Sequence, residues 1–125
     1  MYILTVDTDF SSAHQLRGYK GKCENLHGHN WIVTLSVSGK ELNDAGLLID
    51  FHDLKAIVNT ACERYDHKNL NEIPPFDTIN PSSENIARVM ADIIQDELKK
   101  IDRALFIHSI TIGESASSKC TFTPD

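Results

Sequence analysis

Two stretches of the chain alternate between apolar and polar residues, and both carry histidine at one end. The apolar positions share one parity in each stretch: Leu4, Val6 and Phe10 in residues 2–14, and Trp31, Val33, Leu35 and Val37 in residues 27–38. Alternation with period two predicts a β-strand that buries one face. His14 shares the first apolar parity, and His27 and His29 share the second. If the strands pair as antiparallel neighbours, the three histidines meet at one end of the buried face.

Two later segments have the spacing of amphipathic helices. The first is expected over residues 51–66, because its apolar residues recur at helical intervals and Asp50 precedes it as an N-cap. The second has an apolar stripe over residues 86–101, and Ser82 or Ser83 is expected to cap its start.

The remaining segments predict two more strands and several loops. Residues 105–113 alternate, with one parity made up of Phe106, His108, Ile110 and Ile112. A short strand is expected over residues 119–123, and loops over residues 15–26 and 68–81, where glycine or proline is frequent. The order strand, strand, helix, helix, strand, strand predicts an α+β fold, in which two helices cover one face of four antiparallel strands. Residues 1–125 are expected to form a single domain.

The net charge argues against two classes of partner. Twelve basic and eighteen acidic residues give a formal charge of -6. Non-specific binding to nucleic acid or to an anionic membrane needs a basic surface, so neither partner is expected. A small anionic substrate held by a local pair such as Lys20 and Lys22 remains compatible with this charge.

The cysteines and the apolar runs indicate where the protein works. Three cysteines without regular spacing do not form a disulfide framework and favour a reducing compartment. The first residues lack the basic start and the cleavage site of a signal peptide, and no apolar run is long enough to span a bilayer. A cytoplasmic location is therefore expected.

His14, His27 and His29 have the pattern of a metal site. Three imidazoles that leave a fourth position open form a catalytic zinc arrangement. Nickel, copper or iron would also suit three imidazoles. The alternative for His27 and His29 alone is a pair of surface histidines, which the matching position of His14 makes less attractive.

Cys23 lies in a polar loop beside Lys22 and four residues before His27. Nearby positive charge favours the thiolate, so Cys23 is a candidate general base. The rival interpretation makes Cys23 itself a zinc ligand, although its spacing from the histidines is unusual for a structural zinc site. A cysteine is more often a small buried apolar residue, and that interpretation suits Cys62 and Cys120.

Three further groups are weak signals when each is taken alone. Asp66 and His67 are adjacent and have the chemistry of a proton-relay pair, but a capping aspartate followed by an exposed histidine is the commoner explanation of such a pair. Glu114 ends a predicted strand, where a glutamate is usually solvated. Ser82 and Ser83 are adequate as helix caps.

Taken together, these motifs resemble the 6-pyruvoyltetrahydropterin synthase family. The motifs that recur in the same order are Ser12-Ala13-His14, Cys23 with His27-Gly28-His29, Asp66-His67 with Leu70-Asn71, the segment Asn80 to Asn85, and Glu114. The resemblance covers nearly the whole chain. The short chain and the Lys22-Cys23 context look most like the bacterial members that make 6-carboxy-5,6,7,8-tetrahydropterin for queuosine biosynthesis. Gly113 departs from the lysine or polar residue that often precedes the glutamate.

The resemblance implies a fold and an assembly. The fold is the tunnelling fold (T-fold), in which a β-hairpin, two helices and a second hairpin follow one another. Family members form homohexamers as dimers of trimers, with active sites between subunits, so Asp66 and His67 are expected to serve the Cys23 of a neighbour.

The resemblance also implies a reaction and a role for each motif. The substrate would be 7,8-dihydroneopterin triphosphate, and the products 6-carboxy-5,6,7,8-tetrahydropterin, acetaldehyde and triphosphate. The implied roles are zinc ligation by His14, His27 and His29, proton abstraction by Cys23, proton relay by Asp66 and His67, and pterin binding by Glu114, Ser82 and Ser83. Lys20 and Lys22 are candidates for the triphosphate.

Two alternatives stay open. The sibling 6-pyruvoyltetrahydropterin synthase uses the same residues and releases triphosphate without acetaldehyde. A non-catalytic module that binds pterin or zinc would use the same fold without needing Cys23 or the Asp66-His67 pair. A folate-linked variant of the family carries glutamate in place of the cysteine, and Cys23 argues against it.

Overall fold

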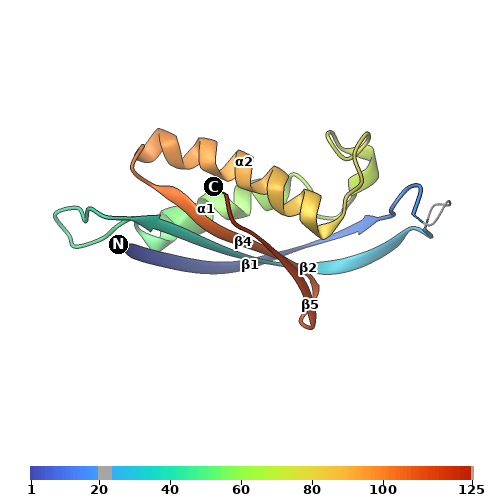
Figure 1. Cartoon of the computed structure of the whole chain (residues 1–125), viewed down its shortest axis with the longest axis horizontal. Helices are drawn as coiled ribbons and strands as arrows, with labels where there is room; N and C mark the ends of the chain where they lie inside the picture. The colour runs from blue at the N-terminus through green and yellow to red at the C-terminus, as the bar shows by residue number, and fades with distance from the viewer. Residues whose placement is uncertain (20–23, 125) are drawn as a thin grey trace.

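The computed structural model describes residues 1–19 and 24–124. A five-stranded sheet in the order β3-β1-β2-β4-β5 is covered on one face by two helices (Figure 1). The elements in chain order are β1 (Tyr2–His14), β2 (His27–Gly39), α1 (Phe51–Glu63), β3 (Lys68–Asn69), the 3-10 helix η1 (Leu70–Glu72), α2 (Ser83–Ile101), β4 (Phe106–Ser115) and β5 (Ser118–Phe122). The predicted α+β architecture is confirmed.

The hairpin of β1 and β2 is paired without interruption. Its register runs from Tyr2 opposite Gly39 to His14 opposite His27. Both predicted strands are therefore confirmed, and β2 is one residue longer than expected. The apolar parity of both strands faces the helices, since Phe10, Trp31 and Leu35 are buried.

The expected count of four antiparallel strands is wrong, because β3 adds a fifth strand that runs parallel to β1. Ser12 pairs with Lys68 and Ala13 with Asn69. The sequence predicts only a loop at residues 68 and 69. A strand of two residues is too short to show a period, so it leaves no alternation in the sequence.

Both predicted helix caps are confirmed, but α1 is shorter than expected. The Asp50 side chain accepts a hydrogen bond from His52 N at 2.7 Å, and Ser82 Oγ accepts one from Asn85 N at 3.2 Å. α1 ends at Glu63, three residues before the expected end, because the chain turns there. Tyr65 N and Asp66 N both donate to the Cys62 carbonyl in that turn.

β4, the third of the predicted strands, has a β-bulge that changes which side chains are buried. Ser36 pairs with Ser109 and Val37 with Ile107, so His108 is the extra residue. The bulge reverses the parity of the strand. Ile107 is therefore buried and Phe106 is 54% exposed, and the expected single face of Phe106, His108, Ile110 and Ile112 is wrong for its first two members.

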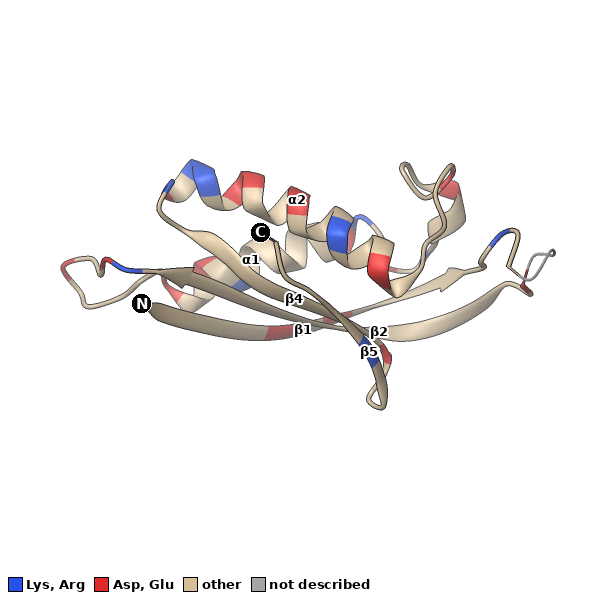
Figure 2. Cartoon of the chain, viewed as in Figure 1, with Lys and Arg blue, Asp and Glu red and all other residues tan. Residues whose placement is uncertain are grey.

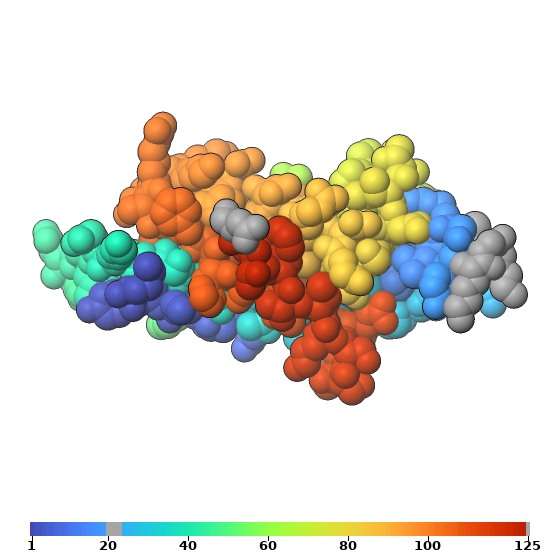
Figure 3. Space-filling view, in the orientation of Figure 1, coloured from blue at the N-terminus to red at the C-terminus, as the bar shows by residue number. Residues whose placement is uncertain are grey.

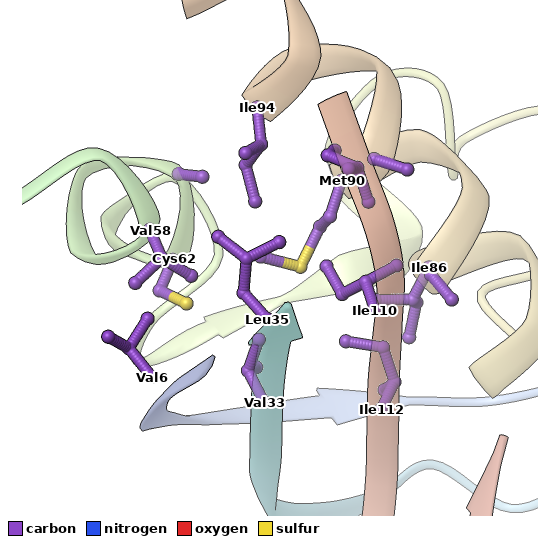
Figure 4. Close-up of a cluster of buried hydrophobic side chains, with 14 of the residues drawn as sticks. Val6, Val33, Leu35, Val58, Cys62, Ile86, Met90, Ile94, Ile110 and Ile112 are labelled. Atoms are coloured by element: carbon purple, nitrogen blue, oxygen red, sulfur yellow. The ribbon is translucent and has the colours of Figure 1, made fainter. Parts of the chain in front are cut away.

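The core lies between the sheet and the two helices (Figure 4). The buried side chains drawn there come from all layers: Val6, Val33 and Leu35, Ile110 and Ile112 from the sheet, Val58 and Cys62 from α1, and Ile86, Met90 and Ile94 from α2. Leu35 lies at the centre of this cluster and is 0% exposed.

Charged residues of both signs follow the length of α2 (Figure 2). Lys99 and Lys100 lie in its last turn and Glu84 in its first, which suits the helix dipole. Within residues 1–19 and 24–124, neither helix combines the length and the apolar character that crossing a membrane would need.

Replacing Leu35 by alanine should lower the free energy of unfolding by about 2–5 kcal/mol, because it leaves a cavity in the central layer. Urea denaturation followed by circular dichroism measures the change. The control is Leu42→Ala, since Leu42 is 41% exposed and its loss should cost less than about 0.5 kcal/mol. Equal losses for both variants would contradict this description of the core.

Candidate active site

Three histidines meet where β1 ends and β2 begins. His14 is paired with His27, and His29 is paired with Ser12, so all three side chains lie at the same end of the hairpin. One ring nitrogen from each histidine lies within 4.8 Å of the other two. His14 is buried, His29 is partly buried and His27 is exposed. The cluster is therefore reachable from solvent on the side of His27.

Two main-chain carbonyls determine which ring nitrogens are free. His14 Nδ1 lies 2.7 Å from the Pro81 carbonyl oxygen, and His27 Nδ1 lies 2.8 Å from that of Asn25. A carbonyl only accepts, so each Nδ1 carries the proton and each Nε2 of the neutral ring has a lone pair. The two Nε2 atoms are 3.1 Å apart. Two lone pairs at that distance repel each other unless a cation lies between them.

The third histidine adds another nitrogen without a partner. His29 Nε2 is buried and has no hydrogen bond to any described residue. Two imidazole ligands of a tetrahedral zinc ion lie about 3.3 Å apart, given Zn–N bonds of about 2.0–2.1 Å. The 3.1 Å separation of His14 Nε2 and His27 Nε2 is close to that value. The three histidines therefore fit a divalent metal ion.

Burial keeps His14 in the form that binds metal. Loss of solvent lowers the pKa of the His14 imidazole, and the neighbouring His27 and His29 rings lower it further, while the hydrogen bond to Pro81 opposes the shift. The neutral ring is thus favoured at neutral pH. A metal binds neutral imidazole, so this shift favours binding.

The buried Trp31 side chain packs against two of the three imidazole rings. Its ring meets His14 edge to face at 4.8 Å between centroids and His29 at 5.0 Å. Its Nε1 donates to the Ser12 carbonyl at 3.2 Å and is itself fixed by that bond. The Trp31 ring and the two main-chain carbonyls together hold the imidazoles in position.

Glu114 is close to the histidine cluster. Its Oε2 lies 4.0 Å from His29 Nε2. Glu114 is the extra residue of a bulge between β4 and β5, because Gly113 pairs with Lys119 and Ser115 pairs with Ser118. A Cβ on Gly113 would lie 3.0 Å from the Ser115 carbonyl oxygen, which explains a small residue at this point of the bulge.

Asp66 and His67 form a pair that is anchored to β1. His67 Nδ1 lies 3.0 Å from Asp66 Oδ1, and Ser11 N donates to the same oxygen at 2.9 Å. These two contacts, the Ser11 bond first, lower the pKa of the Asp66 carboxyl, so it is ionised at neutral pH. His67 has a φ of 55° and its main-chain N donates to the Ser11 carbonyl.

The His67 ring is accessible, since 82% of its side chain is exposed. It borders a pocket of about 490 Å³ whose other walls are Ser11, Ser12, Ala13, Gly28, His29, Asn30, Lys68 and Asn69. Ser11, Ala13 and Asn30 have the parity opposite to that of the three histidines, so the pocket opens on the face of the sheet that lacks helices. No described hydrogen bond or ion pair joins His67 to the histidine cluster.

The other predicted site residues fall into two groups. Ser82 caps α2 and directly follows Pro81, so it lies next to the carbonyl that holds His14. Ser83 is the first residue of α2. Cys23, Lys20 and Lys22 lie outside the described residues.

The two described cysteines do not belong to the candidate site. Burial raises the pKa of the Cys62 thiol to about 12, with smaller contributions from Asp66 and Asp9. Burial also raises the pKa of the Cys120 thiol. Both thiols are therefore poor bases and poor nucleophiles at neutral pH.

The carbonyls of Asn25 and Pro81, which orient two of the rings, are not predicted by the sequence. A main-chain carbonyl is present at every position, so the residue type carries no signal for it. The one hint is the Asn80-Pro81 dipeptide, which by itself indicates only a loop.

Comparison with known proteins decides the family. The family model described as 6-pyruvoyl tetrahydropterin synthase matches residues 3–125. The chain belongs to this family. The resemblance inferred from the motifs is confirmed, as is the expectation of an enzyme with the tunnelling fold.

The relatives of this family member carry two different names. The 6-carboxy-5,6,7,8-tetrahydropterin synthase of Bacillus subtilis is 31% identical over 126 residues, covering 97% of this chain and 84% of its own. The 6-pyruvoyl tetrahydrobiopterin synthase of Dictyostelium discoideum is 31% identical over 128 residues, covering 93% and 91%. The solved 6-pyruvoyl tetrahydropterin synthase of Caenorhabditis elegans superposes with a TM-score of 0.81 at 27% identity, covering 100% and 98%. Overall identity therefore does not separate the two activities.

Replacing His27 by alanine should abolish stoichiometric metal binding with little loss of stability, because His27 is exposed whereas its Nε2 faces His14. We expect the affinity for zinc to fall by more than about 100-fold, since even an outer partner of a ligand is worth 10–100-fold. Metal content after dialysis, measured by mass spectrometry, gives the result. His52→Ala is the control, as His52 is also exposed and lies on α1. Full metal content in His27→Ala would contradict the site.

Proposed function

We propose that this family member converts 7,8-dihydroneopterin triphosphate and one water into 6-carboxy-5,6,7,8-tetrahydropterin, acetaldehyde and triphosphate. The main support is the cluster of the His14, His27 and His29 side chains, whose Nε2 atoms are available to a metal. Cys23 precedes His27 by four residues, and the chain belongs to this family. The name of the Bacillus subtilis relative supports the carboxy product. The pathway would be queuosine biosynthesis in the cytoplasm.

The metal is proposed to be zinc, held by His14, His27 and His29. When bound there, zinc would supply Lewis acidity and lower the pKa of the hydroxyls on the substrate side chain. The open fourth position leaves room for those hydroxyls. His14 and His27 keep their Nε2 atoms available because their Nδ1–H groups donate to carbonyls.

Cys23 is proposed as the general base that removes a proton from the substrate side chain. In the sequence Cys23 lies four residues before His27, one of the proposed metal ligands. A thiolate is a competent base at neutral pH when positive charge is close. Lys22 supplies such a charge next to it in the sequence. Lys20 and Lys22 are the proposed contacts of the triphosphate.

Asp66 and His67 are proposed to relay protons. The ionised Asp66 carboxylate holds the His67 Nδ1–H, so His67 Nε2 is left to accept or donate a proton. The ring is exposed and borders the pocket on the helix-free face. These positions make His67 accessible to a second copy of the chain.

An assembly with active sites between subunits fits these positions. We propose a homohexamer built as a dimer of trimers. β3 pairs only with Ser12 and Ala13 of β1, and within the described chain no other strand pairs with that edge. β5 forms the opposite edge of the sheet. Open strand edges tend to pair with another chain, so both are candidate contacts between subunits.

The pterin ring is proposed to bind next to the metal. The Glu114 carboxylate would accept hydrogen bonds from the 2-amino group and the ring N–H of the pterin. Glu114 Oε2 is 4.0 Å from His29 Nε2, which puts this contact beside the metal cluster. Ser82 and Ser83 are the other proposed pterin contacts, at the start of α2.

The second candidate is a 6-pyruvoyltetrahydropterin synthase, which the Dictyostelium discoideum relative favours at the same identity. It would use the same residues and retain all carbons of the substrate side chain. A non-catalytic pterin-binding or zinc-binding module is the alternative of another class, and the enzyme names of the relatives argue against it. The presence of Cys23, Asp66 and His67 together favours an enzyme.

Product analysis separates these candidates. The zinc-loaded protein should release acetaldehyde and triphosphate from 7,8-dihydroneopterin triphosphate, measured by chromatography and by a coupled aldehyde assay. Release of triphosphate without acetaldehyde would assign the pyruvoyl activity. Tight binding of the pterin without turnover would assign the module.

Replacing Cys23 by alanine should abolish turnover, with at least about a 100-fold loss of kcat, because general-base catalysis contributes about 10²–10⁴-fold. Zinc content, measured on the same sample, should stay at the wild-type level. Cys120→Ala is the control, since the raised pKa of Cys120 makes it inert and it lies in β5. Loss of zinc from Cys23→Ala would instead make Cys23 a ligand.

A further inference from the structure

The chain that leaves β1 after His14 is held by side chains instead of a strand. Gln15 N donates to Asn71 Oδ1 at 2.9 Å, and Asn71 Nδ2 donates back to the Gln15 carbonyl at 2.9 Å. Arg17 N donates to Asn80 Oδ1 at 2.8 Å, and Asn80 Nδ2 donates back to the Arg17 carbonyl at 3.0 Å. Each asparagine amide thus satisfies both main-chain groups of one residue, as a paired strand would.

The second of these asparagines directly precedes the residue that orients His14. Pro81 has no N–H with which to anchor itself, and it restricts Asn80 to extended conformations. Its carbonyl nevertheless lies 2.7 Å from His14 Nδ1. Pro81 is buried, and the hydrogen bonds that fix the position of its carbonyl come from the residues on either side of it.

Those residues are fixed from three directions. The Asn80 side chain grips Arg17, and the Asn80 carbonyl accepts from Asn85 Nδ2 at 2.9 Å. Arg17 Nη2 donates to the carbonyls of Phe76 and Ile79, both at 2.8 Å. Ser82 caps α2 on the far side of Pro81. In Figure 3 the segment of residues 76–82, in yellow, lies beside the blue chain that comes after β1.

We propose that Asn80, with Arg17 and Asn85, positions the Pro81 carbonyl and so fixes the ring orientation and the Nδ1–H tautomer of His14. These three residues are called the Asn80 clamp. Among the described residues, no hydrogen bond joins the clamp to the cluster of Nε2 atoms, so the clamp acts through Pro81. The effect of the clamp on metal affinity rests on the proposed role of His14 as a metal ligand. Its effect on the His14 tautomer does not depend on that role.

The chemistry of the cluster makes the tautomer decisive. If His14 carried its proton on Nε2, that N–H would donate to His27 Nε2, which is 3.1 Å away, and the two ligand atoms would be lost to metal. The Pro81 carbonyl favours the other tautomer because it offers an acceptor only to Nδ1. The Asn80 clamp therefore holds His14 in the tautomer that binds metal.

Asn80→Ala and Asn71→Ala form a matched pair. Both remove an amide that makes two hydrogen bonds to the segment after β1. Only Asn80 directly precedes Pro81 in the chain. In the metal-free protein at neutral pH, long-range proton–nitrogen NMR should show His14 as the Nδ1–H tautomer in the wild type and in Asn71→Ala. Asn80→Ala should show a mixture that includes Nε2–H.

Zinc affinity, measured by competition with a chelator, gives a second readout. It should fall about 10–100-fold in Asn80→Ala, the range typical of lost outer partners, and less than about 3-fold in Asn71→Ala. Thermal midpoints should fall by similar amounts in both variants. Asn85→Ala removes one hydrogen bond of the clamp, in the first turn of α2, and should give a smaller change of the same kind.

The outcomes are distinguishable. If Asn80→Ala and Asn85→Ala keep the wild-type tautomer and a zinc affinity equal to that of Asn71→Ala, the clamp is only structural and the proposal is wrong. If Asn80→Ala does not fold, Asn85→Ala alone decides by the same two readouts. If the wild type binds no zinc, the proposed function fails, and the tautomer measurement still decides on the clamp.

Discussion

The register of the β1–β2 hairpin is the constraint on which the rest of the site depends. His14 is paired with His27, and His29 lies two residues further along β2 on the same face. A slip of one residue would turn every β2 side chain to the opposite face. Trp31, Val33 and Leu35 would then leave the core, where each is 0% exposed. The energy that buries these apolar side chains therefore also brings the three histidines together.

Strands fix where the histidines lie, but loops fix how their rings are turned. The hairpin sets the positions of the Cα atoms, and the Asn25 and Pro81 carbonyls set the protonated nitrogen in two of the rings. Neither carbonyl lies in a strand or a helix. A metal site needs both the right position and the right tautomer of each histidine. An imidazole in the right place with its proton on Nε2 cannot be a ligand through that atom.

Period and parity account for the features that could be predicted from the sequence. The two long strands, the caps at Asp50 and Ser82, and the convergence of the three histidines all rest on such local patterns. The bulge at His108 was not predictable, because one extra residue reverses the parity without changing the composition of the strand. β3 was missed because its two residues owe their conformation to β1 and not to a pattern of their own.

One edge of β1 lies between the histidine cluster and the Asp66-His67 pair. Ser11 exchanges main-chain and side-chain hydrogen bonds with the Asp66-His67 pair, β3 pairs with Ser12 and Ala13, and the asparagine amides of residues 71 and 80 grip Gln15 and Arg17. The Ser11 contacts hold His67 in a left-handed conformation, which costs about 1–3 kcal/mol for a residue other than glycine. His14 lies on the same stretch of β1. A shift of this strand end would therefore move His14 and the Asp66-His67 pair together, so the separation between them depends on β1.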